Sequence, residues 1–481
     1  LSIRRQRQMC IRDRYTRFRN NTILVIIGNI GSKLMSFIML PFYTRWLPIE
    51  GYGTVDIINI YVSFLIGVVT CAIAESVFIF PKGQPVEKQK EYLNSGLLFM
   101  IISFVITLCA FMLIKFVCDG ENIQNSFVDN IWMIYSILTT SALQQLVQQF
   151  TRSIDKIKVY SIAGVVLTGL TIVFSFIFIP RWGVAGYVVA MSLANVATVI
   201  YSLIASNSYT YLEFRYANII SCRKMLSYSM PLVPNNIMWW LVSALNRPVM
   251  EIYLGMEAIG LFAVANKFPS VFSSVFAMFA VSWQISVMEE YGKDGYSQFF
   301  NKVFRIVILL MILASCLISI LSPLIISVFA NENYYESWRF VPVLSLSSVF
   351  MAISGMAGSN FSATKESKYF FYSSVWGALA AVIANIIFIP RIGTMGACLS
   401  VALSFLVMSL SRCFYCWRHV KINNILRIML SLAGNIIIIM LTLSSLYISF
   451  KIVGYCLFFI FILYVNGDVL KQVFNVIKTK I

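Results

Sequence analysis

Long apolar runs separated by short polar breaks make up most of this sequence. Each run is continuously apolar over roughly 20 residues, the length that an α-helix needs to cross the hydrocarbon core of a bilayer. The runs do not alternate between apolar and polar residues with period two, so the pattern favours helices over a membrane barrel. We predict about 14 transmembrane helices, at residues 22–44, 54–80, 92–118, 127–150, 159–180, 184–206, 228–250, 259–283, 299–329, 338–362, 369–389, 393–416, 424–447 and 450–472.

Composition supports a membrane protein. Hydrophobic residues make up 59% of the chain and charged residues only 12%, with a mean hydropathy of +0.81, which is more apolar surface than a soluble fold can bury. A net charge of +17 would suggest a nucleic-acid partner in a soluble protein. Here the Lys and Arg residues lie mostly in short connections between apolar runs, so we interpret them as topology signals and expect no nucleic-acid binding.

The distribution of these cations predicts the orientation of the chain. The connections after every second helix each carry two to four Lys or Arg residues, with Arg412 counted in the connection after the twelfth helix. Each of the opposite connections carries one. Because positive residues concentrate on the cytoplasmic side of membranes, we expect both termini to be cytoplasmic.

Two short sequences occur twice. IFIPRWGVAG at 177–186 matches IFIPRIGTMG at 387–396, and LPIEGYG at 47–53 more weakly matches LGMEAIG at 254–260. Both matches shift the chain by six predicted helices, and an even shift preserves orientation. The sequence therefore predicts an all-α integral membrane protein built as a parallel repeat, with two six-helix bundles facing each other across an axis normal to the membrane and two additional helices.

We divide the chain on this basis. The first 14 residues resemble a translated cloning remnant and are left out of the fold reasoning. The predicted segments are a cytoplasmic tail at 1–21, a first bundle at 22–206, a cytoplasmic linker at 207–227, a second bundle at 228–416, and two helices with a cytoplasmic tail at 417–481.

Cations inside the predicted helices are the first candidates for a functional site. Lys33 lies near the middle of the first helix, where an ammonium costs about 3 kcal/mol and normally faces a cavity or a partner. Lys267 precedes Pro269, which would bend its helix. Arg247 lies towards the outer end of the seventh helix, either in a cavity or extended to the headgroups. Arg45 lies at the outer end of the first hairpin, where an interfacial position is the simpler interpretation.

Acidic residues inside the predicted helices are fewer. Glu75 lies well inside the second helix, and Asp56 lies near its outer end. Glu75 either pairs with a cavity cation or binds a coupling proton or sodium ion. A cavity lined mainly by cations suits an anion, of which phosphate or pyrophosphate is the natural choice.

Other kinds of chemistry have little support. The ten cysteines are scattered without a CxxC spacing, and His419 is the single histidine, so we expect no metal site and no disulfide framework. No Walker A motif is present, and the longest stretch outside the predicted helices is only about 20 residues. We therefore expect no catalytic residues, no cofactor and no enzyme activity.

The motifs together resemble a known family. NIGSKLMSFIMLPFYTRWLPIEGYGTVDI (29–57), RSIDKIKVYSI (152–162), FIPRWGVAGY (178–187) and NRPVMEIYLGMEAIGLFAVANKF (246–268) are similar to the Wzx-like polysaccharide flippases of the multidrug/oligosaccharidyl-lipid/polysaccharide (MOP) superfamily. The resemblance implies transfer of undecaprenyl-pyrophosphate-linked oligosaccharides across a bacterial cytoplasmic membrane, driven by an ion gradient. It also implies lipid-linked oligosaccharide and membrane lipid as partners, with a polysaccharide polymerase and glycosyltransferases nearby.

Three alternatives stay open. A lipid II flippase shares the 14-helix plan and the cationic cavity. A drug/cation antiporter of the same superfamily usually has an acidic residue in the first helix, where this chain has Lys33. An integral-membrane polymerase or acyltransferase would need an acid, base or nucleophile cluster in a sizeable outer loop, and the predicted outer loops are short.

Overall fold

The computed structural model describes residues 37–123 and 125–468, where every regular element is a helix. The helices that cross or line the two halves of the chain are α2 (Leu40–Trp46), α3 (Ile49–Val69), α4 (Ile73–Ile79), α5 (Val86–Gly120), α6 (Ser126–Asp129), α7 (Ile131–Ser153), α8 (Ile157–Ala205), α9 (Ile219–Ser229), α10 (Leu232–Ser243), α11 (Asn246–Glu290), α12 (Tyr296–Phe329), α13 (Val341–Ala363), α14 (Ser367–Ile392), α15 (Thr394–Cys416), α16 (Ile425–Leu443) and α17 (Ile448–Val465). Short 3₁₀ helices lie at Ser208–Tyr211, Phe214–Tyr216 and Glu332–Arg339.

The helices confirm a multi-pass membrane protein. Within the described residues, ten helical stretches are long and apolar enough to cross a bilayer. Two of them, α8 and the stretch Leu232–Glu290, each cover two of the predicted helices. α8 changes direction at Gly183 and α11 at Gly255, where the backbone leaves the helical conformation. The total of 14 helices stays a prediction, because most of the first one lies outside the described residues.

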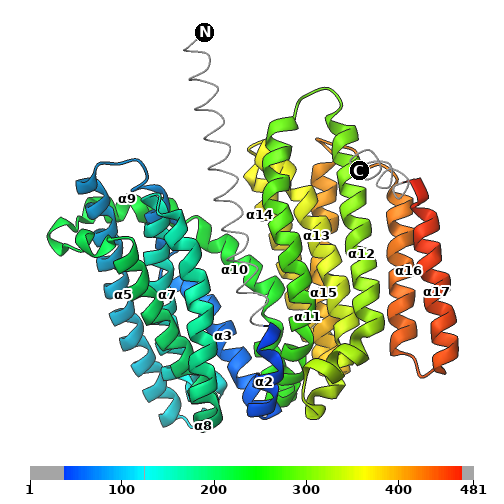
Figure 1. Ribbon diagram of the computed structural model, residues 1–481, viewed down its shortest axis with the longest axis horizontal. Coiled ribbons are helices and arrows are strands. Elements are labelled where there is room, and N and C mark those ends of the chain that lie inside the picture. The colour runs from blue at the N-terminus through cyan, green and yellow to red at the C-terminus, as the bar shows by residue number, and fades with distance from the viewer. Residues whose placement is uncertain (1–36, 124, 469–481) are drawn as a thin grey trace. The chain divides into compact units, whose positions relative to one another are not determined.

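The chain forms two compact units. Of the described residues, 37–39 and 54–237 belong to the first unit, and 40–53 and 238–468 belong to the second. In the first unit, α4 packs against α7 and α9, and α9 crosses one end of this unit (Figure 1). Its core includes Ile73, Leu93, Leu146, Phe150 and Met225.

In the second unit, α13 is the central helix and contacts α11, α12 and α15. In the 18-residue stretch of α13 with the highest hydropathy, 89% of the residues are buried. The helix is rich in serine, alanine and glycine, the small residues that let helix backbones approach closely in a membrane. α16 and α17 lie side by side, with α16 against α12 (Figure 1). Asp468 links them to the bundle, because it pairs with Arg305 of α12 at 2.8 Å and with Arg427 of α16 at 2.7 Å.

The repeated hairpin has the same geometry in both copies. Gly183 has φ 54° and ψ −124°, and its counterpart Gly393 has φ 65° and ψ −142°. A Cβ on Gly186 would lie 2.2 Å from the carbonyl oxygen of Phe178, and a Cβ on Gly396 would lie 2.3 Å from that of Phe388. Only glycine permits this close return of the chain, which explains the identities between the two copies.

The weaker repeat brings its two copies into direct contact within the second unit. A Cβ on Gly53 would lie 2.2 Å from the carbonyl oxygen of Met256, and a Cβ on Gly260 would lie 2.1 Å from that of Ile49. Gly53 and Gly260 occupy the seventh position of their copies, and Ile49 and Met256 occupy the third. The contact is therefore reciprocal, and α3 and α11 cross with their backbones touching.

The prediction of one continuous helix at 54–80 is wrong. α3 ends at Val69 and α4 begins at Ile73, and between them Cys71 and Ala72 have φ angles of 48° and 53°. Thr70 directly follows α3 and donates its hydroxyl to the carbonyl of Ile66 at 2.7 Å. Non-helical backbone at membrane depth persists only where protein or water satisfies its polar groups, so this break marks an irregular site within the first unit.

Candidate functional site

The predicted site cations have different environments. Lys33 lies outside the described residues, so its position stays a prediction. Arg45 is exposed in the last turn of α2. Lys267 is half-buried in α11, two residues before Pro269, and forms no ion pair within the described part of the chain.

Arg247 is enclosed by protein. It lies at the start of α11 with only 4% of its surface exposed, so in this structure its guanidinium does not extend to the outer surface. Nη1 donates to the carbonyl of Ser243 at 2.8 Å and to Oδ1 of Asn246 at 2.9 Å. The guanidinium carbon lies 4.6 Å from the centre of the Phe262 ring. This burial does not fit the interpretation in which Arg247 extends to the headgroups, and its position in a substrate cavity stays a prediction.

The predicted acids lie on either side of the break in the second helix. Asp56 is half-buried in α3. Glu75 is half-buried in the first turn of α4, directly after the left-handed residues. Within the described residues, Gln149 of α7 donates to the Glu75 carboxylate at 3.4 Å, a long contact.

The structure corrects one interpretation and reveals an additional cation. Arg412 is not a connection residue, because it lies inside α15 and is only 2% exposed. Nε donates to Oγ of Ser373 at 3.0 Å, Nη2 to Oγ of Ser374 at 3.3 Å and Nη1 to the carbonyl of Ser354 at 3.4 Å. Its position within the predicted helix 393–416 was the available signal that it belongs to the bundle.

Aromatic rings complete the Arg412 site. The guanidinium carbon lies 5.0 Å from the centre of the Phe370 ring and 5.6 Å from that of Trp239. Arg412 thus joins α10, α13, α14 and α15 through neutral groups only, and no carboxylate pairs with it in the described part of the chain. Hydroxyls, carbonyls and ring faces can hold a buried guanidinium without neutralising it, so the positive charge stays in the bundle.

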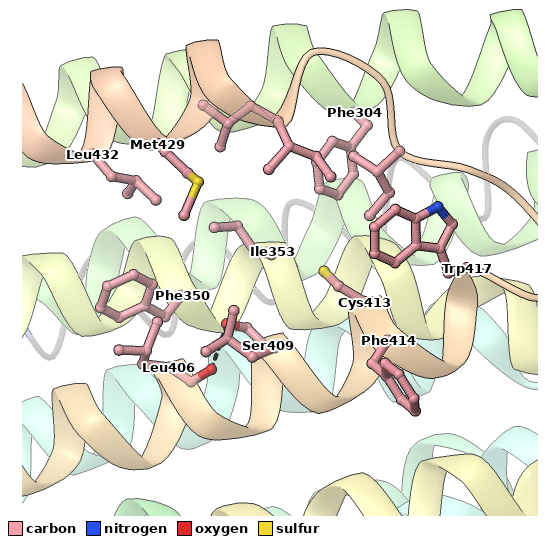
Figure 2. A pocket seen from close by; sticks show the side chains of 14 residues that line it. Phe304, Phe350, Ile353, Leu406, Ser409, Cys413, Phe414, Trp417, Met429 and Leu432 are labelled. Atoms are coloured by element: carbon pink, nitrogen blue, oxygen red, sulfur yellow. Dashed lines mark hydrogen bonds between the residues drawn. The ribbon is translucent and has the colours of Figure 1, made fainter.

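An apolar cavity of about 330 Å³ lies beside this site in the second unit. Figure 2 shows that its wall comes from α12, α13, α15 and α16, and that hydrocarbon and aromatic side chains point into it. Its labelled lining includes Phe350, Ile353, Cys413, Trp417 and Met429. Such a cavity can hold hydrocarbon but offers no charged group to an ion.

The described residues contain no cluster of His, Cys, Asp or Glu side chains able to hold a metal ion. The available chemistry is that of buried guanidinium groups, polar uncharged side chains and apolar surface.

Comparison with known proteins identifies the family. Residues 18–285, more than half of the chain, match the family described as polysaccharide biosynthesis protein. The chain belongs to this family. It therefore groups with the Wzx-like flippases of the MOP superfamily, as the sequence motifs predicted. No curated protein matches the chain significantly.

Solved structures with the same fold are transporters. The lipid II flippase MurJ in an inward closed conformation is 15% identical, with a TM-score of 0.68 over 94% of this chain and 99% of that one. A multidrug resistance MATE family transporter of the MOP superfamily, inward-facing, is 16% identical, with a TM-score of 0.57 over 86% and 94%. A MOP superfamily transporter from Pyrococcus furiosus is 14% identical, with a TM-score of 0.51 over 85% and 96%. These similarities confirm the fold.

Proposed function

We propose that this protein is a flippase that moves an undecaprenyl-pyrophosphate-linked oligosaccharide from the cytoplasmic to the outer leaflet of a bacterial cytoplasmic membrane. Membership of the polysaccharide biosynthesis family is the observation that carries the proposal. The oligosaccharide would serve surface polysaccharide synthesis, together with a polymerase and glycosyltransferases. Both termini would lie in the cytoplasm.

The mechanism is alternating access, without a catalytic residue, a metal or a cofactor. The repeat would supply two bundles, at 22–206 and 228–416, that expose a site to each side of the membrane in turn. The pyrophosphate would bind cations drawn from Lys33, Arg247 and Lys267, with Arg45 at the outer end, while the polyprenyl tail stays among hydrocarbon. The apolar lining of the cavity in Figure 2 is consistent with a substrate that carries a lipid tail.

An ion gradient would drive transport. One charge that crosses the full membrane potential supplies about 2.3 kcal/mol per 100 mV. Glu75 is the candidate for the coupling carboxylate because it directly follows the break between α3 and α4, and Asp56 is the alternative. A permanent ion pair would hold helices together but could not exchange a proton or sodium ion.

Transport in reconstituted vesicles tests the proposal. A fluorescent polyprenyl-pyrophosphate oligosaccharide should move between leaflets in vesicles that contain the protein. Arg247→Gln should reduce this rate at least about 10-fold, since it removes a charge-assisted contact with the anion. The matched control is Arg339→Gln, which changes an exposed arginine paired with Glu336 and should transport normally.

The same assay separates the alternatives. Faster movement of lipid II than of the oligosaccharide would assign the protein to the lipid II flippases. Proton-coupled movement of a cationic dye, without movement of either lipid, would assign it to the antiporters. Normal transport by Arg247→Gln would show that this arginine does not contact the anion.

A further inference from the structure

An apolar groove lies on the first unit between α5 and α9, apart from the cations and the cavity described above. Its volume is about 390 Å³, and most of its lining residues are apolar. The apolar lining comes from two helices, with Leu98, Phe99 and Ile102 on α5 and Ile219, Cys222 and Leu226 on α9. α5 is long and apolar enough to cross a bilayer, so we expect membrane lipid to have access to this groove.

One cation is among the residues that line the groove. Arg223 of α9 lines it together with Ser95 and Asn218. Arg223 is exposed and forms no ion pair with any residue that the structure describes. The nearby carboxylate of Glu91 is already occupied, because it accepts from Ser221 of α9 and pairs with Lys88 at 2.6 Å. An exposed positive charge without an ion-pair partner among the described residues therefore adjoins an apolar groove.

α9 is held in place on the first unit by hydrogen bonds at both ends. The backbone N–H of Asn218 donates to Oγ of Ser95 at 2.8 Å, and Oγ of Ser76 donates to the carbonyl of Met225 at 2.8 Å. α9 also exposes an apolar side chain outside the groove lining, since Ile220 is 75% exposed. A short helix with exposed apolar residues and adjacent Arg and Lys residues is typical of an element that lies in the membrane interface.

We propose that this groove is a binding site for one anionic phospholipid, with an acyl chain between α5 and α9 and its phosphate on Arg223. The groove supplies apolar surface along a membrane-crossing helix, and Arg223 supplies a charge complementary to the headgroup. A zwitterionic lipid offers the same acyl chain, but its own cation reduces the attraction to Arg223. The site would hold the helix that leads from the first unit into α10 against the membrane surface.

Cys222 provides a probe inside the groove. It is half-buried there, and burial raises the pKa of its thiol above the ordinary value, so alkylation is slow and sensitive to further shielding. The experiment uses full-length protein in which the other nine of the ten cysteines are replaced by serine. Alkylation by N-ethylmaleimide is measured in nanodiscs of phosphatidylcholine with or without phosphatidylglycerol.

Phosphatidylglycerol should slow alkylation of Cys222 about five-fold, the effect expected of one arginine near an anionic headgroup. Arg223→Gln should abolish the protection. Arg215→Gln should retain it, because Arg215 lies outside the groove and pairs with Glu213 at 2.7 Å. This control separates headgroup binding from a general effect of membrane charge on the thiol. Leu98→Trp should fill the groove and make alkylation independent of the lipid.

Three results would overturn the proposal. Equal alkylation in both kinds of nanodisc would show that the groove does not select an anionic lipid. If phosphatidylglycerol still protects Cys222 in Arg223→Gln, the phosphate does not bind Arg223. Displacement of phosphatidylglycerol by a polyprenyl pyrophosphate at a lower concentration would instead assign the groove to the transported substrate.

Discussion

The reciprocal contact between α3 and α11 makes Gly53→Ala a sharp test of the packing. The added methyl group would lie 2.2 Å from the carbonyl oxygen of Met256 and 2.9 Å from the backbone nitrogen of Gly260. Ordinary contact begins at 3.4 Å, so the two backbones must separate by about 1 Å. Neither neighbouring atom belongs to a flexible side chain. Overpacking of this kind costs about 1–3 kcal/mol.

Thermal unfolding of the purified protein in detergent measures this effect. A loss of about 2 kcal/mol should lower the Tm by several degrees, roughly 4 °C. Gly260→Ala should have a similar effect, because its methyl group would meet the carbonyl oxygen of Ile49 at 2.1 Å. The double variant should lose less than the sum, since either methyl group separates the same pair of backbones.

The matched control is Gly67→Ala in the same helix. Its methyl group would lie 3.9 Å from Cβ of Asn236, an ordinary contact. Alanine favours a helix over glycine by about 1 kcal/mol, so this variant should be as stable as the parent or slightly more stable. If Gly53→Ala is no less stable than Gly67→Ala, the backbones at Gly53 do not touch and the reciprocal contact is wrong.

Three further changes test the other contacts. Asp468→Asn should weaken the attachment of α16 and α17, measured as faster proteolysis of the connection before α16, because it removes the charge that both arginine partners share. Arg412→Gln should cost about 2 kcal/mol in thermal unfolding, since three buried hydrogen bonds to the guanidinium are lost, and an unchanged Tm would contradict this role. Lys90 holds the pKa of the Glu213 carboxyl below its usual range. The contact therefore stabilises the loop fully at pH values above the ordinary carboxyl pKa, and this stabilisation is lost as the pH falls through the lowered pKa. Hydrogen exchange at 207–218 should rise over that acid range in the parent and be pH-independent, after correction for intrinsic exchange, in Glu213→Gln.

The sequence by itself determined that this is a multi-pass helical membrane protein and that two short motifs repeat within it. A lipid environment leaves the backbone few alternatives, because its polar groups must bond within each helix, so continuous apolar length is nearly sufficient to predict a crossing. The hairpin repeat was equally readable. Pro180 and Pro390 fix their own φ angles, and Gly183 and Gly393 can adopt the positive φ that the turn requires, so these signals are local.

The candidate site could be predicted only in part. Arg247 and Glu75 were identified because a charge within an apolar run is conspicuous. The sequence left open whether Arg247 is buried or extends to headgroups, since a long side chain can do either from the same helix position. In the structure Arg247 is buried and lies against the ring of Phe262, which does not fit headgroup contact.

Only the tertiary structure revealed the remaining features, because each depends on residues far apart in the chain. The environment of Arg412 requires serines on two other helices, at 354 and 373. The left-handed residues 71 and 72 are not glycines, so local preference gave no signal of the break in the second helix. The groove beside Arg223 forms because α9 packs against α5, although the two helices are separated by about 100 residues of sequence. Apolar patterning specifies which segments enter the membrane, but side-chain contacts between helices decide where a buried charge is held.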